Sequence, residues 1–161
     1  MRRIGFLLIV MMWALPLFGQ DQNVNVLGRW ADGRCEAVFR RGGFTFVGNG
    51  SFLDVYQRRN TVYQRLDQIL LPASVKDVWV KGDTTHVFVA CGDSGLNVAY
   101  FDYRDRRFKA NAQGKYIIGR YQTTGYASAI MEQDGYTYVA DGPAGLTVLN
   151  TDYPSNPYRV G

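Results

Sequence analysis

A pattern that occurs twice constrains the fold of this chain more than any other feature of its sequence. Residues 86–102 read HVFVACGDSGLNVAYFD, and residues 136–152 read YTYVADGPAGLTVLNTD. Both stretches contain an apolar run, a short turn with glycines, and a second apolar run that ends near an aspartate. Short apolar runs bounded by Gly, Asn, Asp or Pro are typical of β-hairpins. The repetition therefore predicts a fold built from copies of one hairpin unit.

A third, weaker copy lies upstream at residues 33–66, where FTFV and FLDVY flank a short turn. In each copy a short strand precedes the hairpin and a weaker run follows it, so each unit is predicted to hold four antiparallel strands. The first unit is expected to have strands at 37–39, 44–47, 52–56 and 63–66. The second is expected to have strands at 77–80, 86–90, 96–102 and 116–121, and the third at 128–131, 136–140, 146–150 and 158–161.

The turns and the strand composition narrow the fold further. Asn49 and Gly50 are predicted to be the central pair of a type I′ turn, which needs a positive φ at both positions. Strand runs such as FTFV, HVFVA and TYVA are apolar at nearly every position, which is expected of strands that are covered on both faces. Residues 109–115, KANAQGK, form a polar insertion before the last strand of the second unit.

A four-stranded antiparallel unit that repeats every roughly 40–50 residues is typical of a β-propeller blade. The predicted fold class is therefore all-β, a β-propeller-type array of about three four-stranded antiparallel blades in an incomplete ring. The blades are expected at about 34–70, 71–122 and 123–161, which together fill residues 34–161. Closed propellers have about four to eight blades, so we expect a partial chain of a longer propeller. The alternatives are an open three-blade arc and a ring closed by self-association.

The start of the chain predicts export. Two arginines precede an apolar run that ends at Phe18, and Gly19 is small enough to precede a cleavage site. This arrangement is typical of a secretory signal peptide, here at residues 1–19, followed by an N-terminal lead-in at 20–33. The apolar run is shorter than the roughly 20 residues of a membrane-spanning helix. We expect an extracellular, cell-surface or periplasmic protein with no membrane span after signal cleavage.

Charge and cysteine content exclude several classes of function. The formal net charge is +4, and it includes the two arginines of the signal peptide. The remaining basic residues are scattered and form no stripe of the kind that binds nucleic acid. Cys35 and Cys91 are the only cysteines. In blades of this kind they lie on the same rim of neighbouring units, so the alternatives are a disulfide between them and two unpaired thiols.

Candidate chemical residues are few, and each has a structural explanation. Asp93, Asp141 and Asp152 lie in glycine-rich corners, where calcium would need about six to eight oxygen ligands and turn formation explains an isolated carboxylate. His86 is the only histidine and is expected to be a partly buried or surface strand residue. Gly-Asp-Ser-Gly around Ser94 is similar to the nucleophile strand of chymotrypsin-like proteases, but the repeat explains it as a turn. Ser128 lacks a Gly-x-Ser-x-Gly context. No catalytic, metal-binding or cofactor-binding residue is predicted, and no cofactor.

Aromatic residues leave two interpretations open. Trp30, Trp79 and the tyrosines can line a carbohydrate or peptide surface, because their rings combine apolar area with a polar tip. They can also pack between blades, which is the interpretation that we favour for Trp79.

The third unit resembles the LVIVD repeat of secreted and surface β-propellers from bacteria and archaea. Residues 138–161, YVADGPAGLTVLNTDYPSNPYRVG, match that repeat over its whole length, with departures at Asn150 and Tyr153. The second unit keeps VFVACGDSGLNVAYFD but lacks the proline-containing corner, and the first keeps only FTFVGNGSFLDV. The resemblance covers about residues 28–161 in all.

The resemblance implies a non-enzymatic exported propeller that acts as an interaction scaffold for a protein or glycan at the cell surface or in the periplasm. The alternative is part of a secreted propeller enzyme, such as a lyase, hydrolase or quinoprotein, whose catalytic residues lie in further blades. The binding residues and the identity of the ligand are not predicted. Further blades or self-association are expected to complete the ring.

Overall fold

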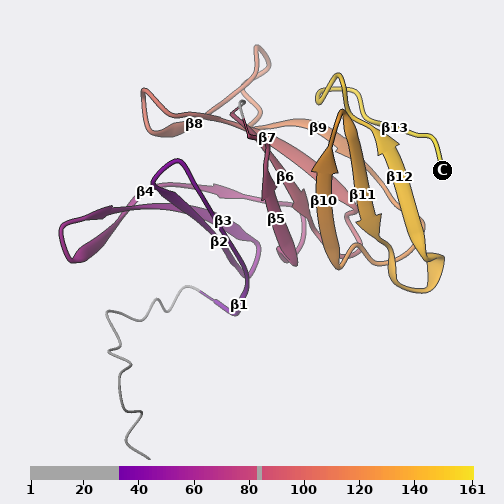
Figure 1. Ribbon diagram of the computed structural model, residues 1–161, viewed down its shortest axis with the longest axis horizontal. Coiled ribbons are helices and arrows are strands. Elements are labelled where there is room, and N and C mark those ends of the chain that lie inside the picture. Colours follow the sequence, from indigo (N-terminus) through magenta and orange to yellow (C-terminus); the bar gives the residue numbers. More distant parts are fainter. Residues whose placement is uncertain (1–32, 83–84) are drawn as a thin grey trace, which may run out of the picture.

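Three antiparallel sheets stand side by side in the order of the sequence, as the computed structural model shows (Figure 1). The structure describes residues 33–82 and 85–161. Sheet 1 contains β1 (Cys35–Arg41), β2 (Phe44–Asn49), β3 (Phe52–Arg59) and β4 (Val62–Leu70). Sheet 2 contains β5 (Asp77–Val80), β6 (His86–Ala90), β7 (Leu96–Asp102), β8 (Arg107–Lys109) and β9 (Ile117–Tyr121). Sheet 3 contains β10 (Ala129–Gln133), β11 (Tyr136–Ala140), β12 (Leu146–Asn150) and β13 (Tyr158–Arg159), with a 3₁₀ turn η1 (Gly142–Ala144).

The predicted fold class is confirmed. Within the described residues the sheets form an open array, with sheets 1 and 3 at its two ends and sheet 2 between them (Figure 1). Five predicted strands have the bounds of β5, β6, β7, β11 and β12. Three of them, β7, β11 and β12, begin directly after a glycine of the preceding turn. The expected signal peptide, the lead-in and Trp30 lie outside the described residues, apart from Gly33. The part of the chain that the structure describes contains no helix long and apolar enough to cross a membrane.

The second sheet has five strands instead of the predicted four. β8 pairs with the end of β7 at Tyr100, Phe101 and Asp102, while β9 pairs with its beginning. Phe108 of β8 is buried in the core between sheets 1 and 2, and its backbone N–H donates to Asp67 of β4 at 2.7 Å. The charged run RDRR directly precedes this single phenylalanine, so the sequence shows no apolar run that would indicate a strand here.

The turn at residues 49–52 also differs from the prediction. Asn49 pairs with Phe52, so Gly50 and Ser51 are the central residues of the hairpin loop. Gly50 has a φ of 61°, and Ser51 is not among the described residues with a positive φ. The expected type I′ turn with Asn49 and Gly50 at its centre is therefore wrong. Asn49 instead remains in the strand, where its side chain donates to the buried carboxylate of Asp54 at 3.1 Å.

Each sheet has a leading face, which is turned toward the preceding sheet, and a trailing face, which is turned toward the following one. In sheet 2 the leading face carries Val78, Val87, Val89, Ala99 and Phe101, which form one core with the trailing face of sheet 1. The trailing face of sheet 2 carries Phe88, Ala90, Leu96 and Val98, which form a second core with Ile130, Val139 and Leu149 of sheet 3. Strands of sheet 2 are apolar on both faces because both faces are covered.

Two aspartate carboxylates form hydrogen bonds between neighbouring sheets. The Asp77 carboxylate at the start of β5 accepts from the backbone N–H of Ile130 in sheet 3 at 2.9 Å. Asp67 makes the equivalent kind of contact between sheets 1 and 2 through Phe108. These charge-assisted hydrogen bonds join each sheet to the next one.

Candidate functional site

A small pocket lies where three connections between strands meet. Its walls come from the segment between β4 and β5, the β6–β7 turn, and the segment before β10. The cavity has a volume of about 130 Å³. It is lined by Ala73, Ser74, Lys76, Gly92, Asp93 and Tyr126. We call this the rim pocket.

Lys76 is the central charge of the rim pocket. Its ammonium group donates to Glu36 of β1 and lies 5.7 Å from the centroid of the Tyr126 ring. Arg34 also pairs with Glu36, with 2.9 Å between its Nε and the carboxylate. The hydrogen bond to Lys76 lowers the pKa of Glu36, and the same bond raises the pKa of Lys76, with a smaller contribution from Tyr126. The cation is therefore held between a carboxylate and an aromatic face.

Gly92 places Tyr126 beside this cation. Its φ is 51°, and a Cβ at this position would lie only 2.9 Å from the Tyr126 ring. Gly92 and Ala127 exchange two backbone hydrogen bonds of 3.0 Å, which hold the segment before β10 against the β6–β7 turn. The glycine thus allows the ring to approach the backbone closely, and the two hydrogen bonds keep it there.

The size and lining of the rim pocket indicate what it can bind. Pockets that enclose a small-molecule substrate usually measure about 300–1,000 Å³, so the rim pocket, at about 130 Å³, is too small to enclose such a molecule whole. It offers an ammonium donor at Lys76, a carboxylate at Asp93, a hydroxyl at Ser74 and one side of a tyrosine ring. This set of groups suits a hydroxyl-rich or polar ligand that stacks against a ring.

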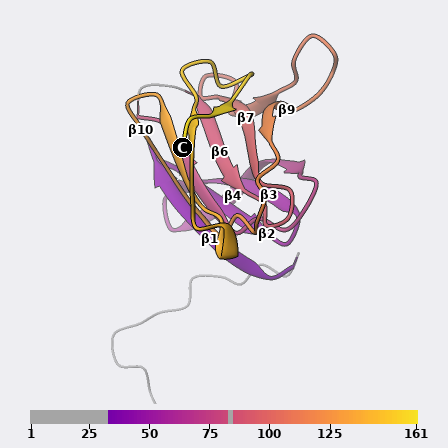
Figure 2. The ribbon, with the colours of Figure 1, turned by 90° about the vertical axis from the view of Figure 1, so that its right-hand side faces the viewer.

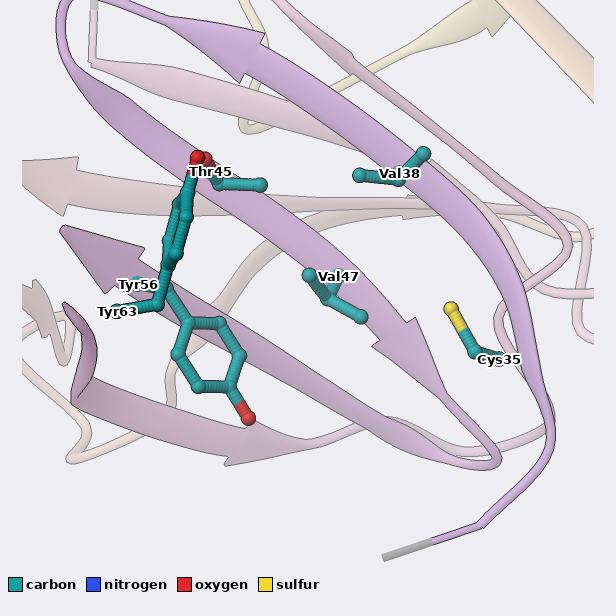
Figure 3. Close-up of a pocket in the computed structure, with 6 residues that line it drawn as sticks. All are labelled: Cys35, Val38, Thr45, Val47, Tyr56 and Tyr63. Carbon is teal, nitrogen blue, oxygen red and sulfur yellow. The ribbon is translucent and has the colours of Figure 1, made fainter. Parts of the chain in front are cut away.

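A second hollow lies on the leading face of sheet 1 (Figure 3). It has a volume of about 390 Å³ and almost entirely apolar walls. Its lining residues are Cys35, Val38, Thr45, Val47, Tyr56 and Tyr63. Next to it, the buried Asp54 accepts hydrogen bonds from Gln68 at 2.7 Å and Asn49 at 3.1 Å. The hollow thus combines an apolar floor with an internally satisfied carboxylate.

The three aspartates of the glycine-rich corners lie in separate surroundings. Asp93 is exposed at the rim pocket. Asp141 is fully buried, and its Oδ2 accepts from the backbone N–H of Gly125 at 3.1 Å and from Thr147 at 3.3 Å. Asp152 is exposed and accepts from the Asn150 side chain at 3.1 Å. Across residues 33–82 and 85–161, no group of three or more His, Cys, Asp or Glu side chains is arranged to hold a metal ion.

The structure separates the residues of the protease-like motif. His86 begins β6 and Ser94 follows the end of that strand, which places about four to five strand residues of roughly 3.3 Å each between them. Ser94 accepts from the Asn97 side chain at 3.3 Å inside the turn. His86 is half-buried, its ring packs against Tyr100, and burial lowers its pKa, with a smaller contribution from Lys81. Ser128 donates to the carbonyl of Ala140 at 3.1 Å.

The remaining candidates have structural positions. The Trp79 ring lies 5.2 Å from that of Phe39 in sheet 1 and also packs against the core between sheets 2 and 3. Trp79 therefore packs between sheets, as we expected.

Cys35 is exposed, Cys91 is buried, and both thiols are free. The structure therefore agrees with the alternative of two unpaired thiols and not with a disulfide between Cys35 and Cys91.

Sequence reasoning singled out Asp93 but did not connect it with the other residues of the rim pocket. Lys76 and Tyr126 of the pocket, and Glu36, which accepts from Lys76, belong to three different units and share no motif, so no local signal connects them. Only the glycine-rich turn that contains Gly92 and Asp93 was conspicuous in the sequence.

Comparison with known protein families gives one match. Residues 124–161 match the family model of the LVIVD repeat. They include the whole of sheet 3 together with Tyr126 of the rim pocket. The search of curated proteins found no match. The resemblance of the third unit to the LVIVD repeat is thereby confirmed, and this unit is one of three blade-like antiparallel sheets in the described chain.

Proposed function

We propose that the chain is an exported, non-enzymatic scaffold that binds a protein or glycan at the cell surface or in the periplasm. The observation that carries this proposal is the rim pocket, in which Lys76, Asp93 and Tyr126 converge from loops that join the stacked strands. Binding residues are often placed on loops that a scaffold positions. The layout of residues 1–19 supports export.

The proposed chemistry of recognition is stacking combined with polar contacts. The Tyr126 side chain is 38% exposed, so its ring is accessible to a sugar face or a ligand side chain. Lys76 can donate to ligand oxygens because its hydrogen bond with Glu36 holds the ammonium group in place. Asp93 can accept from ligand hydroxyl or amide groups, which makes the pocket a recognition site for a ligand that both donates and accepts.

A binding assay on a panel of oligosaccharides and peptides tests the proposal. Tyr126→Ala and Lys76→Met should each weaken binding of the retained ligand by about tenfold or more, which is the effect of losing roughly 1.4 kcal/mol. Tyr153→Ala is the matched control, because Tyr153 is an exposed tyrosine that does not line the pocket. Binding that survives both pocket substitutions, or that Tyr153→Ala removes equally, would contradict the proposed site.

Export is tested separately. The mature protein should be recovered outside the cytoplasm with a mass that corresponds to a start at Gln20. Recovery of the unprocessed chain in the cytoplasm would refute the localisation but not the binding site.

A further inference from the structure

The two ends of the array carry complementary faces. The trailing face of sheet 2 packs on sheet 3 with Phe88, Leu96 and Val98. In the aligned repeat the corresponding residues of sheet 3 are Tyr138, Leu146 and Val148. Sheet 3 lies nearest the viewer in Figure 2, with the other two sheets behind it. Sheet 3 therefore presents the same kind of packing surface that sheet 2 has already buried.

Exposure shows that this surface lacks a partner within the described chain. Leu53 and Leu96, at the same repeat position in sheets 1 and 2, are 0% exposed, whereas Leu146 is 59% exposed. Met131, the neighbour of Tyr138 across the β10–β11 pair, is 41% exposed. Contiguous apolar surface of this kind usually marks an interaction site.

The leading face of sheet 1 has the complementary character. Val38 stands at the repeat position of Val78 in sheet 2 and Ile130 in sheet 3, since each pairs with the equivalent valine of the next strand. Val78 and Ile130 are 1% and 6% exposed because the preceding sheet covers them, whereas Val38 is 67% exposed. Val38 borders the apolar hollow of about 390 Å³ (Figure 3), which provides space for the side chains of another sheet.

We propose that a second copy of the chain covers these faces. The trailing face of sheet 3 in one copy packs on the leading face of sheet 1 in the other, and the second pair of faces closes the assembly. The contact reproduces the leading-to-trailing packing that joins sheets 1, 2 and 3 within one chain. The contact joins two different faces, so it is head-to-tail. Head-to-tail contacts form a closed ring when the rotation from one subunit to the next closes the circle. Two chains contribute twice the sheets of one, which falls within the about four to eight blades of closed propellers. This inference concerns assembly and does not depend on the ligand of the rim pocket.

Sedimentation of the purified chain over a range of concentrations tests the pairing. The unchanged chain should associate to a dimer. Val38→Arg and Leu146→Arg should each weaken that dimer by at least about tenfold, because each buries a guanidinium group in an apolar contact. Val62→Arg is the matched control, since Val62 is 66% exposed, as Val38 is, but lies at the β3–β4 turn. All these positions are exposed, so the variants keep the fold, and circular dichroism checks this.

Mixing the two variants distinguishes head-to-tail pairing from other arrangements. Val38→Arg chains retain an intact sheet 3 and Leu146→Arg chains retain an intact sheet 1, so a mixture can form one unchanged contact and should recover association. Cys35, which also borders the hollow, should react more slowly with a maleimide as protein concentration rises. A chain that stays monomeric, association that survives both substitutions, or a mixture without recovery would each overturn the proposal.

Discussion

One repeat position tests the packing model most directly, because it holds leucine in a buried and in an exposed setting. Leu96 begins β7 and is fully buried between sheets 2 and 3. Leu146 begins β12 at the equivalent place and is 59% exposed. Leu96→Ala and Leu146→Ala are therefore the same chemical change in the same local structure. Any difference in their cost comes from the neighbouring sheet.

The expected costs follow from burial. Truncating a fully buried leucine to alanine loses about 2.5 kcal/mol of transfer free energy, and the cavity that remains raises the total to about 3–5 kcal/mol. Leu96→Ala should lower the free energy of unfolding by this amount. Leu146 is only about two-fifths buried, so the same reasoning gives about 1 kcal/mol for Leu146→Ala.

Urea unfolding followed by tryptophan fluorescence measures both values. The experiment is done at a protein concentration at which sedimentation shows the chain to be monomeric, because association would add its own stabilisation. Equal losses of unfolding free energy for the two variants, within about 0.5 kcal/mol, would refute the assignment of Leu96 to a covered trailing face and of Leu146 to an uncovered one.

Three further predictions rest on single contacts. Gly119→Ala should destabilise the chain by about 1–3 kcal/mol, because a Cβ at this position of β9 would lie 1.9 Å from the carbonyl oxygen of Pro154; an unchanged thermal midpoint would contradict that contact. Cys35 should be alkylated in the native monomer at neutral pH while Cys91 reacts only after unfolding, because Cys91 is buried and burial raises its pKa to about 12; mass spectrometry after timed quenching counts the labelled thiols, and two native labels would contradict the burial of Cys91. The pKa of His86 is lowered by burial, so the unfolded chain binds a proton at a higher pH than the folded chain does. The free energy of unfolding should therefore fall as pH drops below about 6.5. The urea midpoints at pH 7.5 and 5.5 should differ less in His86→Gln than in the unchanged chain, and an equal difference would exclude His86 as the cause.

Local sequence determined the strands because a hairpin is a local structure. One glycine-rich turn fixes where β6 ends and β7 begins, and the equivalent turn fixes where β11 ends and β12 begins. The repeat and its resemblance to the LVIVD family also identified the stacked architecture, since a unit that is apolar on both faces needs neighbours. β8 was missed because it has a single buried residue, Phe108, whose backbone N–H donates to Asp67 of another sheet.

Tertiary structure decided which residues at the same repeat position are buried and which are exposed. Nothing near Leu96 or Leu146 in the sequence tells that one is buried and the other exposed, because burial depends on whether another sheet covers the face. The same holds for the rim pocket, where Lys76, Glu36 and Tyr126 are brought together from three units by the stacking of the sheets. Strand formation is governed by residues next to one another, whereas a site depends on the distances between segments that only the packed fold sets.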